Sequence, residues 1–199
     1  MSTEKRTEKE RTMMHAMKRA MKHTEKEHAM STKKHAADMY DFGVGFVPAH
    51  RHVNTDETRG GWVAESAHVA ASAHVGQNAQ VYGSAQVFGS AQVYGSARVC
   101  DDVQIFGSAR VYGNARISGS ARVYGGARVF GHARVYGSAW VSGSARVYDS
   151  AWVYGSARVY DNAGIFCSAR ISGSARISGN VWVSGNVWVY GSAQVFGSA

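Results

Sequence analysis

Cysteine and long apolar runs are scarce in this chain of 199 residues, and each scarcity excludes a class of protein. The two cysteines, Cys100 and Cys167, are too few for a disulfide framework, so we expect free thiols in a reducing compartment. No apolar run is long enough for a signal peptide or a membrane-spanning helix, so we expect no membrane span. The sequence therefore predicts a cytoplasmic location, which means the host cytoplasm if the protein is viral.

Lysine is absent after Lys34, and this absence divides the chain into two parts of different composition. Residues 1–60 hold 12 Lys and Arg against 9 Asp and Glu, whereas residues 61–199 hold 10 Arg against 5 acidic residues. The net charge of +8 favours anionic partners such as nucleic acid, acidic polysaccharide or a membrane surface. The same charge can also simply keep the protein dispersed, so composition leaves both interpretations open.

Residues 1–37 form a charged segment that the sequence predicts to be an α-helix at the N-terminus. Glu, Lys, Met and Ala are good helix formers, and Met14, Met17 and Met21 share one helix face. We expect the helix to run from about residue 8 to residue 29. It either caps a larger body or is a free arm, and its charges also suit contact with a membrane or nucleic acid.

Residues 38–60 form a connector in which aromatic residues, glycines and the single proline replace the charged helix. A repeat protein needs a cap at its end, because the terminal coil otherwise exposes its core and an unpaired strand edge. The sequence offers Phe42, Val44, Phe46 and Val47 as side chains that could cover such an end.

Residues 61–199 consist of one six-residue repeat. A branched aliphatic residue occupies every sixth position from Val63 to Val195, which makes 23 positions without an exception. The residue two positions earlier is chiefly Ala, and the commonest unit reads Ala-Arg-Val-Tyr-Gly-Ser.

Each unit of this repeat is predicted to be a short strand followed by a corner. Ala and Val are two residues apart and point to one side of an extended strand, whereas Arg and Tyr point to the other side. Gly-Ser then turns the chain. One unit buries too little apolar surface to be stable alone, so successive coils must stack. Because no helical period occurs after residue 61, the sequence predicts an all-β solenoid, a parallel β-helix.

The units at residues 105–110 and 159–164 resemble the hexapeptide repeat of the left-handed β-helix superfamily, with an aliphatic residue at the first position and a small one at the fifth. The lead-in at residues 58–63 and the Val-Tyr-Gly-Ser-Ala-Arg units are also similar to bacterial and phage proteins labelled as transferases or polymer-forming cytoskeletal proteins. The resemblance implies a three-sided prism with 18-residue coils. It also implies that an acyltransferase acting as a trimer is one possible function, since many members of the superfamily are such enzymes.

An 18-residue coil sorts the outward residues into columns. One column is an unbroken aromatic ladder on five successive coils, with an arginine column beside it. This predicted binding surface comprises Tyr94, Tyr112, Phe130, Tyr148, Phe166, Arg110, Arg128 and Arg146. Shorter arginine columns are expected on the other two faces, at Arg98, Arg116 and Arg134, and at Arg122, Arg158 and Arg176, where Trp140 interrupts the row.

Three interpretations of these columns stay open. Stacked arginines repel one another unless solvent, aromatic faces or a bound polyanion compensates them, and aromatic and guanidinium planes along a groove are typical of single-stranded nucleic-acid binders. A flat aromatic face can equally be the contact between protomers. Duplication of one unit also repeats outward residues whether or not they have a use, and stacked aromatic rings stabilise the solenoid by themselves.

Histidine supplies the only candidates for catalysis, namely His50, His52, His68 and His74. One of them would be the general base of an acyltransferase that uses acyl-CoA and has its site between the protomers of a trimer. Active sites of this superfamily are generally shaped by an inserted loop, however, and this repeat has none. His50 and His52 could bind Zn²⁺ together with His68 and His74, but no carboxylate partner is evident in the sequence, and we expect neither a metal site nor a cofactor.

The sequence therefore favours a non-enzymatic structural or binding scaffold that self-associates through its β-helix. The chain stops within a unit, at Ser198-Ala199, and we expect the open coil end to favour association. The alternatives are the trimeric acyltransferase and a surface for a polyanion or nucleic acid.

Overall fold

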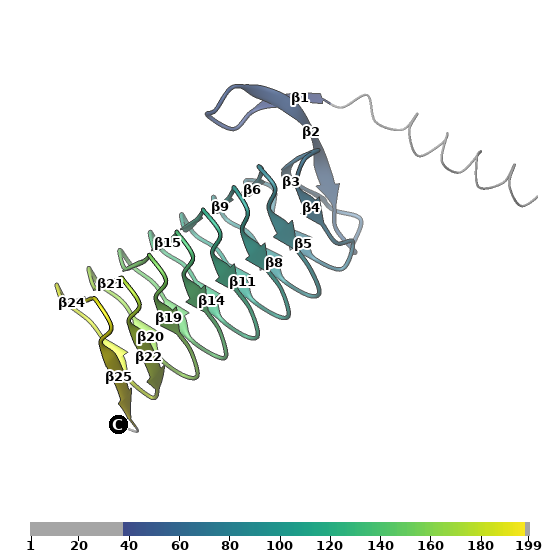
Figure 1. Cartoon of the computed structure of the whole chain (residues 1–199). Helices are drawn as coiled ribbons and strands as arrows, with labels where there is room; N and C mark the ends of the chain where they lie inside the picture. Colours follow the sequence, from purple (N-terminus) through teal and green to yellow (C-terminus); the bar gives the residue numbers. More distant parts are fainter. Residues whose placement is uncertain (1–37, 198–199) are drawn as a thin grey trace, which may run out of the picture. The chain divides into compact units, whose positions relative to one another are not determined.

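The computed structural model describes residues 38–197. The predicted N-terminal helix lies outside the described residues. The described chain consists of strands joined by turns and short connections, and it winds into a parallel β-solenoid (Figure 1).

Three sheets form the sides of this solenoid, and we call them faces A, B and C. Face A is a 10-stranded sheet that contains, in spatial order, β1 (Asp38–Asp41), β2 (Phe46–Val53), β3 (Arg59–Ala64), β6 (Gln80–Val81), β9 (Arg98–Val99), β12 (Arg116–Ile117), β15 (Arg134–Val135), β18 (Trp152–Val153), β21 (Arg170–Ile171) and β24 (Trp188–Val189).

Faces B and C consist only of strands from the repeat. Face B has eight strands: β4 (His68–Val69), β7 (Gln86–Val87), β10 (Gln104–Ile105), β13 (Arg122–Val123), β16 (Trp140–Val141), β19 (Arg158–Val159), β22 (Arg176–Gly179) and β25 (Gln194–Gly197). Face C has seven strands: β5 (His74–Val75), β8 (Gln92–Val93), β11 (Arg110–Val111), β14 (Arg128–Val129), β17 (Arg146–Val147), β20 (Gly164–Ile165) and β23 (Trp182–Val183).

Each strand of the repeat pairs in parallel with the strand one coil further along the chain. Val111 lies opposite Val129, and Val129 opposite Val147, so paired residues are 18 positions apart. Backbone hydrogen bonds follow the same step, as in Arg110 N to Ala127 O at 2.9 Å and Tyr112 N to Val129 O at 3.0 Å. The three sheets and this register make a three-sided solenoid of about eight turns.

The core is a stack of alternating alanine and branched aliphatic residues. Val111, Val129 and Val147 are each 0% exposed, and Ala109 and Ala127 beside them are equally buried. Burying a valine side chain contributes roughly 1.5–3 kcal/mol, so many small contributions sum to the stability of the rod. The inward column predicted from the six-residue period is confirmed.

The connector forms strands β1 and β2, and β2 pairs antiparallel with β3. Phe42 is 2% exposed and packs with Ala49 and Ala64, and Val47 packs against the same cluster. Val44 and Phe46 are each 69% exposed, so the prediction that they cover the end of the solenoid is wrong.

Polar side chains cap the end of face C instead. The Asn54 Oδ1 accepts a hydrogen bond from Val75 N at 2.8 Å, and the Asn54 Nδ2 donates to Val75 O at 3.2 Å. The His52 Nε2 donates to Ala73 O at 3.1 Å. Because β5 is the terminal strand of face C, these side chains satisfy backbone groups that no neighbouring strand pairs.

Most corners place a glycine in the left-handed backbone region, and aspartate replaces it at Asp101, Asp149 and Asp161. Aspartate tolerates this conformation better than most residues. Each of these carboxylates accepts a hydrogen bond from the backbone N–H of the corner residue one coil further on, as in Gly119 N to Asp101 Oδ2 at 2.8 Å. These aspartates therefore link neighbouring coils by hydrogen bonds.

The corner at Gly125 and Gly126 allows a test of whether the first corner position requires a left-handed backbone conformation. Gly125 has a φ of +69°, and an added Cβ would lie 3.1 Å from Gly143 O, whereas Gly126 has no such φ and its Cβ would lie 3.5 Å from the same atom. We expect Gly125→Ala to lower the free energy of unfolding by about 1–2 kcal/mol. Gly126→Ala should be neutral or stabilise by up to about 1 kcal/mol. Urea unfolding followed by circular dichroism measures both, and equal midpoints for the two variants would contradict this requirement.

Candidate binding surface

The predicted aromatic ladder is a continuous stack on face C. Neighbouring ring centroids are 4.8–4.9 Å apart, and their planes are parallel within 1–2°, from Tyr94 through Tyr112, Phe130 and Tyr148 to Phe166. The rings are half-buried and cover one another's faces. A nucleic-acid base would need the space that the next ring already fills, so the ladder presents ring edges and hydroxyl groups, and its inner rings offer no free face for base stacking.

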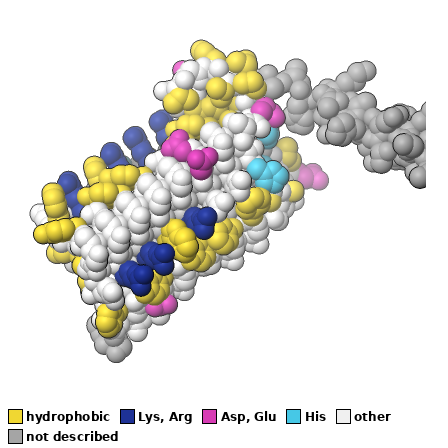
Figure 2. All heavy atoms as spheres, viewed as in Figure 1, with side chains coloured by type: hydrophobic (Ala, Val, Ile, Leu, Met, Phe, Trp, Pro, Cys, Tyr) yellow, Lys and Arg dark blue, Asp and Glu magenta, His cyan; other side chains and the backbone are white. Residues whose placement is uncertain are grey.

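Exposed arginines form in-register columns on two of the faces. Arg110, Arg128 and Arg146 follow one another on face C beside the ladder, and the second column, on face A, comprises Arg98, Arg116 and Arg134. Figure 2 shows rows of basic side chains beside hydrophobic ones along the solenoid. Within residues 38–197 the one ion pair joins His50 and Glu65, so no carboxylate lies within 4.0 Å of these guanidinium groups.

Tryptophan separates arginines elsewhere on faces A and B. The Arg122 and Arg158 Cζ atoms lie 5.2 and 4.6 Å from the ring centroid of Trp140, one from each neighbouring coil. Trp152 is sandwiched in the same way between Arg134 and Arg170, both at 4.9 Å. Each such contact is worth about 0.5–1 kcal/mol at an exposed site. Sequence reasoning treated Trp140 only as an interruption, although the 18-residue spacing already placed it between two arginines.

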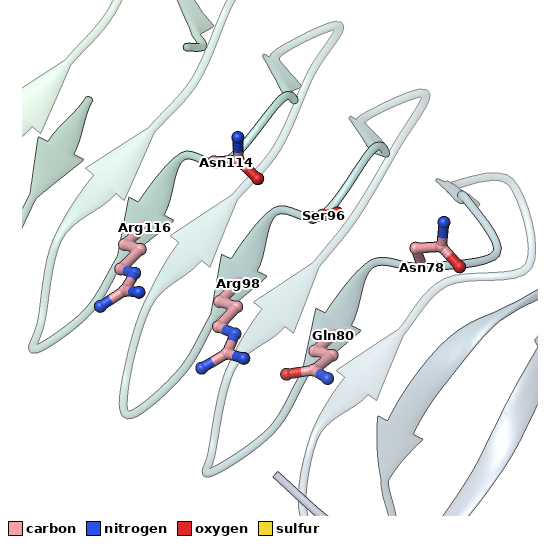
Figure 3. A pocket seen from close by; sticks show the side chains of 6 residues that line it. All are labelled: Asn78, Gln80, Ser96, Arg98, Asn114 and Arg116. Atoms are coloured by element: carbon pink, nitrogen blue, oxygen red, sulfur yellow. The ribbon is translucent and has the colours of Figure 1, made fainter. Parts of the chain in front are cut away.

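A shallow hollow of about 240 Å³ runs along the corner between faces C and A. It is built from one corner residue and one outward strand residue on each of three successive coils: Asn78, Gln80, Ser96, Arg98, Asn114 and Arg116. Figure 3 shows the two guanidinium groups extending side by side from β9 and β12, with the amide and hydroxyl side chains along the corner. The sequence placed the predicted binding surface on face C and did not predict this hollow.

The four histidines lie on three different strands: His50 and His52 on β2, His68 on β4 and His74 on β5. His68 is an exposed residue of face B with its ring 5.4 Å from that of Phe88, whereas His74 belongs to face C. The His50 Nδ1 lies 2.7 Å from Glu65 Oε1, so the sequence-based statement that no carboxylate partner is evident is wrong.

The described part of the chain contains no preformed metal-binding site. No group of three or more His, Cys, Asp or Glu side chains within residues 38–197 is placed to hold a metal ion. The thiols of Cys100 and Cys167 are both free in the structure. Burial raises the pKa of the Cys100 thiol.

The fold and its surface columns define a β-solenoid repeat protein. The family model described as the YdcK beta solenoid repeat matches residues 109–125, 127–143, 169–185 and 175–191, so these parts of the chain are similar to that repeat. Neither the curated proteins nor the solved structures contain a match to this chain. Within residues 38–197 the structure contains no helix that is long and apolar enough to cross a membrane.

The capping histidine predicts a pH dependence of stability. Burial lowers the pKa of His52 below 6.5, and the nearby His50 and His74 lower it further, so the folded chain holds this imidazole neutral. As pH falls below 6.5 the unfolded chain binds this proton first, and stability therefore declines until the pH passes the folded pKa. We expect the thermal midpoint to fall between pH 7.5 and pH 5 through this residue.

His52→Gln removes this titration, because a glutamine amide can donate to Ala73 O at any pH. The variant should show a smaller fall in thermal midpoint than the wild type, measured by differential scanning calorimetry at both pH values. His68→Gln, an exposed histidine of face B, is the matched control and should keep the wild-type pH dependence. The same fall in all three proteins would contradict the role of His52.

Proposed function

We propose that this chain is a cytoplasmic, non-enzymatic scaffold of the left-handed hexapeptide β-helix superfamily that self-associates side by side through face C. The observation that carries the proposal is the ladder of five rings whose planes are parallel within 1–2°. Four steps of 4.8–4.9 Å make it about 19 Å long. Sheets normally twist, and flat sheets are typically stabilised by stacking on another surface.

Charge selects one arrangement of two such faces. The arginine column precedes the ladder by two residues on each strand, so a twofold axis parallel to the solenoid puts the arginines of one copy opposite the ladder of the other. There the guanidinium groups can donate to the hydroxyl groups of Tyr94, Tyr112 and Tyr148. A twofold axis across the solenoid would instead place arginine opposite arginine, which is repulsive. The proposed pair is therefore parallel and isologous.

The geometry favours this scaffold over the acyltransferase. His52 is committed to a backbone carbonyl at the cap, and His50 to Glu65. The repeat strands recur every six residues from β4 to β25 with no inserted loop that could shape a pocket for acyl-CoA.

The ladder provides the test of self-association. We expect Tyr112→Lys with Tyr148→Lys to weaken association at least tenfold, because each copy would place two ammonium groups opposite the arginine column of its partner. The matched control is Tyr136→Lys with Tyr154→Lys, which changes a stacked tyrosine pair on face A whose rings are 4.9 Å apart. Sedimentation velocity over a range of protein concentrations measures the association of all three proteins.

Two outcomes would overturn the proposal: a wild-type chain that stays monomeric, or a ladder variant that associates as well as the control. If the ladder variant does not fold, Arg110→Glu with Arg146→Glu leaves the rings in place and should weaken association through the same contact. A trimer that forms only with acyl-CoA would support the enzyme instead.

A further inference from the structure

The corner between faces C and A carries a second line of cations that the proposed association does not use. Arg98, Arg116 and Arg134 lie on successive strands in register and are all exposed. Neighbouring strands are about 4.8 Å apart, so three like charges are held within about 10 Å by the backbone. Arg134 lies over the ring of Trp152, but within residues 38–197 no carboxylate pairs with any of the three, so Arg98 and Arg116 are open to solvent ions or a bound anion.

Each arginine of this column follows a corner residue, two positions earlier in the chain, whose side chain can form hydrogen bonds. Ser96 precedes Arg98, Asn114 precedes Arg116, and His132 precedes Arg134, and all three corner side chains are exposed. The hollow lies between the corner residues and the arginines of the first two pairs (Figure 3). An anion in it can therefore be held from both sides, and His132 and Arg134 continue the two rows on the next coil.

The groove is bounded along the solenoid axis. Gln80 occupies the arginine position on the coil before Arg98, and Trp152 occupies it on the coil after Arg134. The Asp149 carboxylate at the next corner accepts a hydrogen bond from Cys167 N at 3.3 Å. The cationic stretch thus covers three coils and ends at an aromatic ring.

We propose that this groove binds single-stranded nucleic acid through its phosphate backbone, with the strand running parallel to the solenoid axis. Arginine together with serine and asparagine side chains is the usual donor set for phosphate oxygens. A phosphodiester has two free oxygens, one for the guanidinium and one for the corner donor. The straight column suits a flexible strand, whereas a duplex winds its phosphates around its own axis.

Binding in this groove is independent of base sequence. Ladder rings on face C cover one another, and both faces of Trp152 are covered by Arg134 and Arg170 at 4.9 Å. No base can therefore stack between these side chains, and the phosphate contacts carry the affinity. Such contacts release counterions, so affinity should fall steeply with salt.

The test compares two charge-matched triple variants of the full chain. Arg98→Gln, Arg116→Gln and Arg134→Gln remove the groove column, whereas Arg122→Gln, Arg158→Gln and Arg176→Gln remove three exposed arginines of face B, outside both the groove and the face C contact. Both sets delete three positive charges and leave residues 1–37 unchanged. Fluorescence anisotropy of a labelled, mixed-sequence single-stranded DNA longer than the groove, titrated at several salt concentrations, measures affinity and salt slope.

We expect the wild type to bind and the groove variant to bind at least tenfold more weakly. Its slope of log K against log salt should be shallower by about 2, since each lost phosphate contact removes about 0.7. The face B variant should lose less than about threefold. Circular dichroism should show both variants folded, and if the groove triple does not fold, Arg98→Gln with Arg116→Gln gives the same comparison.

Three results would overturn the proposal. Equal losses in both variants would mean that net charge alone attracts the strand, and the absence of binding by the wild type would remove the site. Binding of a sulfated polysaccharide, with the groove variant impaired, but not of the oligonucleotide would assign the groove to an acidic polysaccharide. The test does not depend on association through face C, because a monomeric wild type keeps the whole groove.

Discussion

The stacking of one branched aliphatic residue on another, 18 positions apart, holds this molecule together. Val111, Val129 and Val147 are fully buried one above the next, and the backbone hydrogen bonds between their strands repeat with the same step. A slip of one residue would turn every inward valine outward, so the register is strongly fixed. Because the register is fixed inside, the outward residues fall into straight columns, and each surface feature follows from the core.

The columns could be predicted from the sequence because their cause is local and periodic. The six-residue period predicted the strands, and the 18-residue coil that the family resemblance implies placed the ladder from Tyr94 to Phe166 in one column. The cap could not be predicted in the same way. The sequence predicted that apolar Val44 and Phe46 cover the end of the solenoid, but both are exposed. The amide of Asn54 caps the end of face C by hydrogen bonds to the backbone of Val75, 21 residues away. No local sequence pattern indicates that contact.

The candidate site was likewise only partly predictable: the periodic arginine columns could be read from the sequence, whereas the hollow beside them could not. Sequence reasoning found the arginine columns but chose face C for the binding surface, because the ladder beside it was unbroken. Face A became the better candidate only when the coil showed which corner residues border each column. Ser96 and Asn114 are separated from Arg98 and Arg116 by one buried alanine, so they flank the hollow from its other side. The position of these corner side chains across the hollow from the arginines depends on the path of the turn, and residue spacing alone does not determine that path.

The distribution of acidic residues explains why these cations remain available. Asp101, Asp149 and Asp161 replace corner glycines in a left-handed conformation, and their carboxylates accept backbone N–H groups of the next coil. They therefore stabilise the stacking of coils and do not neutralise arginines. Tryptophan compensates the guanidinium groups around Trp140 and Trp152, but Arg98 and Arg116 have neither an acidic nor an aromatic partner among residues 38–197. Because the corner carboxylates join neighbouring coils, they do not pair with Arg98 and Arg116, and these two guanidinium groups can interact with solvent ions or an anionic ligand.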